Sequence, residues 1–306
     1  MIKSYPATFV YMTLISMSII IIMSSNNWFI LWMGFELSLF GFLPLFLNST
    51  QTTEANTKYF LMQTSGSAMF MMSFLTTSFI SPALITLSMF MKMGLFPFLQ
   101  WIPMVMTSLS WEGNMILTTI QKIGPLMVMI MLVSPNIMII ILSTISIMYS
   151  STLGFNQSLM RPLMAYSSIS HSSWIILLSP LSIKLFSLYI FIYFSTTIML
   201  FKSLKNSNME KTNQSYSKES DSVVQNLSLF IMAGIPPFSI FFLKLNVFYL
   251  YVNMPIVVMM LLISTFISTY YYMTIIIPKM SNMWNKMTLK PMIILMMNLI
   301  PSIMLM

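Results

Sequence analysis

The chain has 306 residues, of which 57% are hydrophobic and only 7% charged, with a formal net charge of +8. Soluble proteins carry about 25% charged residues, so this composition excludes an ordinary soluble domain and predicts a polytopic membrane protein. The sequence has no cysteine, one histidine and no glycine-rich nucleotide-binding motif, so we expect no disulfide, metal centre, iron–sulfur cluster or other cofactor in this chain.

Eleven hydrophobic segments of about membrane-spanning length follow one another along the chain. Their approximate spans are 6–24, 28–47, 57–80, 82–101, 113–133, 136–153, 161–179, 183–201, 224–250, 255–277 and 291–306. The first resembles a signal peptide, but no small-residue cleavage site follows it, so we expect it to remain as a helix. The long polar stretch 202–222 is expected to be a solvated loop. The sequence thus predicts an all-α membrane protein with one transmembrane domain, 1–306.

The loop charges test this order of segments. If eleven helices alternate across the membrane, one side receives ten basic loop residues and the other receives only Lys184. The ten are Lys3, Lys58, Arg161, Lys202, Lys205, Lys211, Lys218, Lys279, Lys286 and Lys290. Positive loops stay on the matrix or cytoplasmic side. This bias predicts that the N-terminus and 202–222 face that side, and it explains the net charge without nucleic acid.

Four charged residues lie inside the expected spans and away from their ends: Glu36, Lys92, Lys122 and Lys244. A charge at a helix centre costs roughly 2.5–3.5 kcal/mol, so such residues are usually functional. Lys92 stands in KMGLFPF, and Lys244 follows GIPPF, so proline should interrupt both helices. Broken helices at membrane depth line cavities or ion paths. A buried lysine can release its proton whereas arginine cannot, so the pattern favours a proton relay.

Other interpretations remain open for each residue. The lysines can extend to the membrane surface, and Glu36 can be a structural partner. Lys58 follows Glu54 by four residues, which suits a surface ion pair as well as a functional one. Glu112 and Arg161 are expected at the interface. His171, in SSISHSSW, fits a core histidine or a relay member equally well.

The order of these residues resembles a known family. The strings STQTTEANTKYFLMQ, KMGLFPFLQW, TIQKIGP, LMRPLMAYSSISHSSW and GIPPFSIFFLK occur in the order and spacing of the chain 2 family of animal mitochondrial NADH-ubiquinone oxidoreductase. Members of that family are antiporter-like membrane subunits of respiratory complex I. The resemblance covers nearly the whole chain, and the eleven expected helices suit the animal form. It departs from the family pattern at Leu99, which replaces a histidine, at Pro162, which replaces a basic residue, and in FFLKLN, where Leu243 replaces a proline.

The resemblance implies a proton-translocating subunit of the mitochondrial inner membrane without a redox centre of its own. It implies that Glu36 modulates Lys92, that Lys122 is the central relay, and that Lys244 passes the proton outward, with His171 as the weakest candidate. The implied partners are the other membrane subunits of complex I, the lipid bilayer, protons and internal water. Two alternatives stay open: a free-standing cation/proton antiporter of the same fold, and a structural subunit whose lysines are inert.

Overall fold

The computed structural model describes residues 6–44, 53–76, 80–132, 136–212, 219–236 and 238–278. These residues form thirteen α-helices, and their β-structure is one isolated bridge between Leu159 and Lys211. A helix satisfies its own backbone hydrogen bonds, as apolar surroundings require, so the all-α prediction is confirmed. The chain divides into two compact units, Met1–Leu142 and Ser143–Met306, which are described separately.

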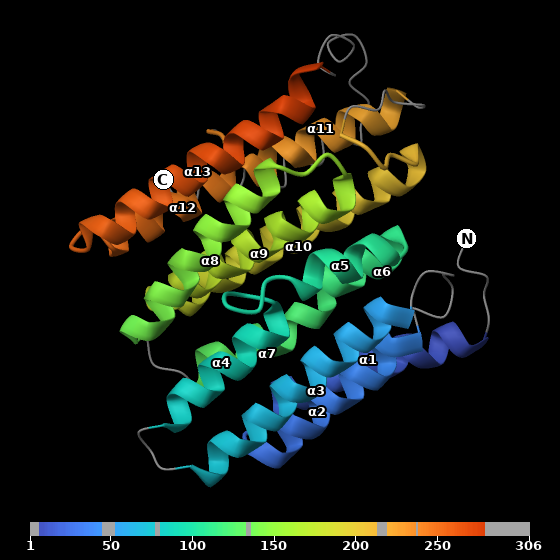
Figure 1. Ribbon diagram of the computed structural model, residues 1–306, viewed down its shortest axis with the longest axis vertical. Coiled ribbons are helices and arrows are strands. Elements are labelled where there is room, and N and C mark those ends of the chain that lie inside the picture. The colour runs from blue at the N-terminus through green and yellow to red at the C-terminus, as the bar shows by residue number, and fades with distance from the viewer. Residues whose placement is uncertain are drawn as a thin grey trace. The chain divides into compact units, whose positions relative to one another are not determined.

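Unit 1 contains seven helices in its described residues and the first residues of α8. They are α1 (Pro6–Ser24), α2 (Trp28–Phe42), α3 (Thr53–Leu75), α4 (Ser81–Met93), α5 (Trp101–Ser108), α6 (Trp111–Thr118) and α7 (Ile120–Leu132). Helix α1 packs along α2, α3 packs against α2, α4 and α5, and α7 packs against α1, α4 and α6 (Figure 1). Helices α3, α4 and α7 therefore bring distant segments together around the middle of this unit.

Close packing in unit 1 depends on small residues on α2. A Cβ atom added to Gly34 would lie 2.6 Å from Ile22 Cγ1, and one added to Gly41 would lie 2.9 Å from Ile15 Cγ1. Glycine thus lets α1 and α2 approach closely, as small residues do between membrane helices.

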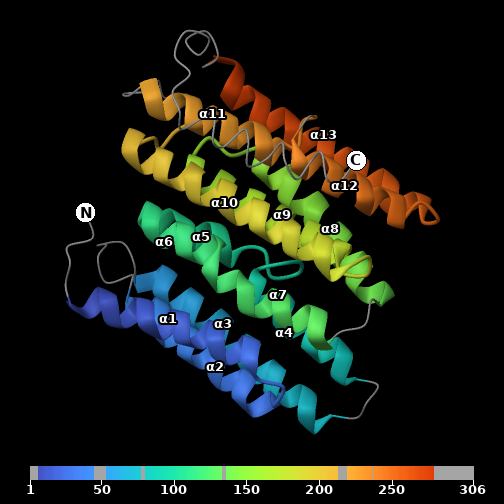
Figure 2. The ribbon, with the colours of Figure 1, turned by 180° about the vertical axis from the view of Figure 1, so that it is seen from behind.

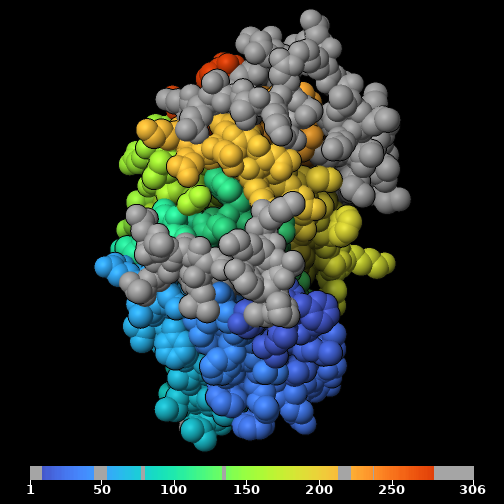
Figure 3. Space-filling view, turned by 90° about the vertical axis from the view of Figure 1, so that its right-hand side faces the viewer, coloured from blue at the N-terminus to red at the C-terminus, as the bar shows by residue number. Residues whose placement is uncertain are grey.

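Atoms of α1 to α3 form a continuous surface in Figure 3, and large apolar side chains such as Phe9, Met17, Ile20, Phe29 and Phe40 are exposed in this unit.

Unit 2 contains most of α8 and five further helices. They are α8 (Ile137–Phe155), α9 (Met160–Leu178), α10 (Ile183–Ser207), α11 (Glu219–Ala233), α12 (Ser239–Leu250) and α13 (Pro255–Ile276). Helix α10 packs against α9, α11 and α12, and α13 packs against α11 (Figure 2). Helix α10 includes residues 202–207, so the first part of the expected loop 202–222 is helical, while 213–218 lie outside the described residues.

The eleven-span count is not confirmed. Four stretches of the described residues are long and apolar enough to cross a membrane: Trp111–Leu132, Ile137–Phe155, Ile183–Ser207 and Pro255–Ile276. Interruptions shorten others, because the expected span 82–101 is divided between α4 and α5 and the span 224–250 between α11 and α12. The expected span 291–306 lies outside the described residues.

The helix interruptions predicted at KMGLFPF and GIPPF occur where glycine and proline indicated. Gly94 ends α4 with φ of 64°, and Gly234 follows α11 with φ of 71°. This left-handed conformation suits glycine because it has no Cβ.

A third interruption was not predicted. The expected span 113–133 is divided into α6 and α7 at Thr119, where φ is −111° and ψ is −78°. Pro125 within α7 lacks the N–H that would bond the Gln121 carbonyl one turn earlier. Thr118 and Thr119 donate their hydroxyls to backbone carbonyls of α6, which also weakens helical continuity.

Candidate functional site

The Glu36 carboxylate of α2 is held by α3. It is half-buried, and Ser67 Oγ donates to Glu36 Oε1 at 2.5 Å. A hydrogen bond to an ionised carboxylate is among the stronger kinds in proteins. Glu36 therefore has a neutral donor on a neighbouring helix as a direct partner.

Lys92 occupies the last turn of α4, just before the Gly94 interruption, and is only 6% exposed. Its Nζ donates to the backbone carbonyl of Gln63 at 3.3 Å and lies 4.5 Å from the Phe35 ring centroid. In return, Gln63 Nε2 donates to the Lys92 carbonyl at 3.1 Å. The ammonium is thus stabilised by a carbonyl and an aromatic face, both of which are uncharged.

Glu36 and Lys92 do not form a direct ion pair. Direct ion pairs do occur at other charged residues, such as Lys58–Glu54 and Arg161–Glu210. Gln63 and Ser67 are one helical turn apart and share a face of α3, so that face contacts both charged groups. A Cβ atom added to Gly66 would lie 3.0 Å from Lys92 Cγ, so glycine gives the lysine room.

Gln63 and Ser67 were not predicted as site residues. The available signal was the polar string QTSGS at 63–67 inside an otherwise apolar segment. Polar residues within such segments usually contact other helices.

Lys122 lies in the first turn of α7, directly after the Thr119 interruption, and is 4% exposed. Its neighbour Gln121 donates Nε2 to the Ser38 carbonyl of α2 at 3.2 Å, so α7 is tied to the helix that carries Glu36. A cavity of about 10 Å³ in unit 1 is lined by Lys92, Gln121, Gln63 and Phe35 among others. Such a volume is about the minimum for one water molecule.

His171 is in the middle of α9 in unit 2 and is 2% exposed. Its Nδ1 atom lies 3.0 Å from the hydroxyl of Tyr189 on α10, and its ring stacks on Tyr193 with centroids 5.2 Å apart. The hydrogen bond fixes the ring orientation and leaves the proton position to the tautomer.

Lys244 lies on α12 in unit 2 and is 5% exposed. Its Nζ is 5.6 Å from the Trp174 ring centroid. A Cβ atom added to Gly234 would lie 3.1 Å from the same Nζ, so the interruption between α11 and α12 folds back against the lysine. A cavity of about 10 Å³ is lined by both Lys244 and His171. The two candidate residues of this unit therefore meet at one cavity.

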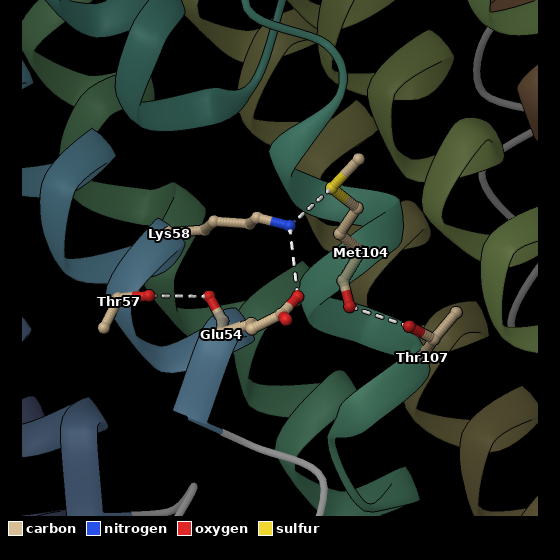
Figure 4. A network of polar contacts seen from close by, with 5 residues as sticks. All are labelled: Glu54, Thr57, Lys58, Met104 and Thr107. Carbon is tan, nitrogen blue, oxygen red and sulfur yellow. Dashed lines mark hydrogen bonds and ion pairs between the residues drawn. The ribbon is translucent and has the colours of Figure 1, made fainter.

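Two ion pairs lie away from these lysines. Lys58 Nζ is 3.8 Å from Glu54 Oε2 and 3.5 Å from Met104 Sδ, at exposed side chains (Figure 4). Arg161 Nη2 is 3.7 Å from Glu210 Oε1. The sequence allowed a surface pair for Lys58 and Glu54, and the structure contains one. Exposed pairs of this kind contribute about 0–1 kcal/mol.

The positions that depart from the family pattern are apolar and buried. Leu99 is 5% exposed and Leu243 is fully buried. Neither side chain has a proton to exchange, so position 99 supplies no relay group in this chain.

Comparison with known proteins points to the same family as the resemblance in the sequence. A family model described as "NADH:quinone oxidoreductase/Mrp antiporter, TM" matches residues 71–268. The chain is 32% identical over 292 residues to NADH-ubiquinone oxidoreductase chain 2 of Lumbricus terrestris, which covers 90% of this chain and 87% of that relative.

Two solved structures extend the comparison at the level of the fold. A chain of respiratory complex I from Thermus thermophilus is similar with a TM-score of 0.82 and 16% identity, covering 100% of this chain and 78% of that chain. A chain of the Mrp complex from Dietzia sp. is similar with a TM-score of 0.76 and 13% identity, covering 86% of this chain and 58% of that one.

Proposed function

The chain belongs to the NADH-ubiquinone oxidoreductase chain 2 family, the antiporter-like proton-translocating subunits of respiratory complex I, and we propose that its proton path uses Glu36, Lys92, Lys122, His171 and Lys244. As a multi-pass membrane subunit, it works together with the other membrane subunits of that complex. The observation that carries the proposal is the burial of three lysines beside helix interruptions, at 6%, 4% and 5% exposure.

Lys92 suits proton exchange because its direct partners are uncharged. A carbonyl and an aromatic ring stabilise the lysine cation less than a directly bound carboxylate would, so Lys92 can release its proton more readily than a lysine in an ion pair. Glu36 lies on α2, which packs against α3 as α4 does, and it acts on Lys92 electrostatically without a direct contact. A change of charge at Glu36 then alters how firmly Lys92 holds its proton.

Lys122 is the central relay in this proposal, and Lys244 with His171 forms the exit segment. Moving one charge against a membrane potential of about 100 mV costs on the order of 2.3 kcal/mol. Burial and close charges shift the pKa of a lysine by up to several units, each worth about 1.4 kcal/mol, so the proton affinity of a buried lysine can change on the scale of that energy. Electron transfer belongs to other subunits, and this chain carries no redox centre.

We further propose the mitochondrial inner membrane as the location, with the N-terminus in the matrix and lipid around the exposed apolar side chains. The ten-to-one loop charge bias supports this orientation. A cysteine introduced at Ser215 should react with an impermeant thiol reagent from the matrix side. Labelling only from the opposite side would contradict the orientation.

Substitution of Lys92 tests the proton-exchange proposal. Lys92→Met removes the proton site, and Lys92→Arg keeps a charge that cannot be released. Both variants should lose proton pumping in complexes of normal subunit content, measured with a pH-sensitive dye in vesicles that oxidise NADH. Near-normal pumping by Lys92→Arg would make Lys92 a structural charge, and unchanged pumping in both would favour the inert-lysine alternative.

A further inference from the structure

The cavity shared by His171 and Lys244 is lined largely by hydroxyl-bearing side chains. Besides the histidine and the lysine, these are Ser151, Ser170, Ser264, Ser268, Tyr271 and Tyr272. Its volume of about 10 Å³ is close to the minimum for one water molecule. A cavity becomes hydrated when it offers a water two to four polar partners. The lining of this cavity meets that condition.

Tyr272 on α13 has a buried hydroxyl without a hydrogen bond. The residue is 1% exposed, and Tyr272 Oη makes no hydrogen bond with any described residue. The side chains of Ser167 and Tyr271 approach it, but outside hydrogen-bonding geometry. A buried polar group without a partner is destabilising, so its presence beside a polar cavity points to a ligand inside the cavity.

The serines of the cavity supply acceptors. Ser264 Oγ donates to the Leu261 carbonyl at 2.7 Å, and Ser268 Oγ donates to the Thr265 carbonyl at 2.9 Å. Ser170 Oγ donates to the Ser167 carbonyl at 2.7 Å. Each hydroxyl has thus committed its only proton to its own helix and keeps lone pairs for a donor. A bound water can accept from Tyr272 and can donate to such oxygens or to the neutral amine of Lys244.

We propose that this cavity binds one water molecule, and that Tyr272 is a positioning residue whose hydroxyl orients the water between His171 and Lys244. This inference rests on the proposed proton path. In the step, an N–H bond of His171 in its imidazolium form breaks as an O–H bond forms on the water, which leaves His171 neutral. Another O–H bond of the water then breaks as an N–H bond forms on neutral Lys244, so the water is regenerated. A metal cation is a poor occupant, because the Lys244 ammonium would repel it.

Tyr272→Phe separates this role from a structural one. If the hydroxyl only lay unpaired in a dry cavity, its removal would leave assembly unchanged or improved, and pumping unchanged. If it orients the water, pumping should fall by about tenfold or more in complexes with normal subunit content, which is less than the roughly 10²–10⁴-fold contribution of a group that itself transfers the proton. The matched control is Tyr270→Phe, the same chemical change two residues earlier on α13, at a side chain that is 58% exposed.

Pumping of the intact complex in vesicles should be compared among the wild type, Tyr272→Phe, Tyr270→Phe and Lys244→Met. Loss in both Tyr272→Phe and Lys244→Met, with a normal Tyr270→Phe control, supports the inference. Loss in Lys244→Met alone overturns the role of Tyr272 and leaves the proposed path standing. Normal pumping in Lys244→Met contradicts the path itself.

A direct measurement completes the test. A map of the intact complex that resolves internal waters should contain one water within hydrogen-bond distance of Tyr272 Oη and Lys244 Nζ. A dry cavity in a map that resolves other internal waters would overturn the inference, even if Tyr272→Phe impaired pumping.

Discussion

The lysine sites of the two units share a construction and differ in their partners. Lys92 and Lys244 are each buried, each lies near an aromatic ring, and each adjoins a helix interruption at a glycine with positive φ. In unit 1, however, α3 contacts both the lysine and an acid, through Gln63 and Ser67. In unit 2, the cavity at the lysine is lined by an imidazole and hydroxyls.

The difference suggests that the two lysines respond to different signals. A nearby carboxylate makes Lys92 sensitive to charge, because the attraction changes whenever Glu36 gains or loses its proton. Lys244 has neutral polar surroundings, so we expect its proposed proton transfer to depend on hydration and on the orientation of hydroxyls. Substitutions at the two sites should therefore affect pumping for different reasons and to different extents.

The largest loss of function is expected on substitution of Gly94, the glycine at the helix interruption of unit 1. In Gly94→Ala, the left-handed backbone costs about 1–2 kcal/mol, and the new Cβ collides with the Ile102 side chain. We expect a loss of assembled complex on native gels. Gly234→Ala carries the same backbone cost, but its Cβ lies 3.1 Å from the mobile tip of Lys244. Gly234→Ala should therefore assemble better than Gly94→Ala but pump poorly. Better assembly of Gly94→Ala than of Gly234→Ala would contradict this expectation.

The next effect concerns the charge-sensitive lysine. Glu36→Gln keeps the size of the side chain and an acceptor for Ser67, so assembly should be normal. Pumping and coupled quinone reduction should fall several-fold, because Lys92 loses the attraction of a nearby negative charge. The measurement is the ratio of protons pumped to NADH oxidised. An unchanged ratio in a fully assembled complex would reduce Glu36 to a packing residue.

The parts of the sites that were predictable from sequence are those with local causes. Glycine and proline indicated the interruptions near 94–97 and 234–238, and isolated charges in apolar runs indicated Lys92, Lys122 and Lys244. The all-α class followed from the same apolar runs.

The remaining features depend on contacts between distant segments. Ser67 and Gln63 matter because α3 packs against α2 and α4, and no local pattern encodes that choice of neighbours. The contact of Gly234 with Lys244 spans ten residues and arises only when the broken helix folds back. The interruption at Thr119 has no glycine beside it, and Pro125 lies six residues later, so local signals placed it poorly.

A smaller effect is expected at Ser67. Ser67→Ala removes one hydrogen bond to the Glu36 carboxylate, which is worth about 1.5–3 kcal/mol for a charged acceptor. The carboxylate remains, so pumping should fall less than in Glu36→Gln. Ser65→Ala is a matched control, because Ser65 lies on the same helix and donates to the Leu61 carbonyl. A pumping loss larger than that of Glu36→Gln would mean that Ser67 acts on more than Glu36.

The smallest effect is expected at Lys58, where a lysine is exposed and directly paired. Lys58 is 45% exposed, its partner Glu54 is 87% exposed, and their atoms are 3.8 Å apart (Figure 4). Water screens such a pair, so Lys58→Met should change stability by no more than about 1 kcal/mol. It should leave pumping intact, whereas Lys92→Met at a buried site should abolish it. The same chemical change at the two lysines thus isolates burial as the cause. A pumping defect in Lys58→Met as deep as that of Lys92→Met would show that burial is not what distinguishes the proton-exchanging lysines.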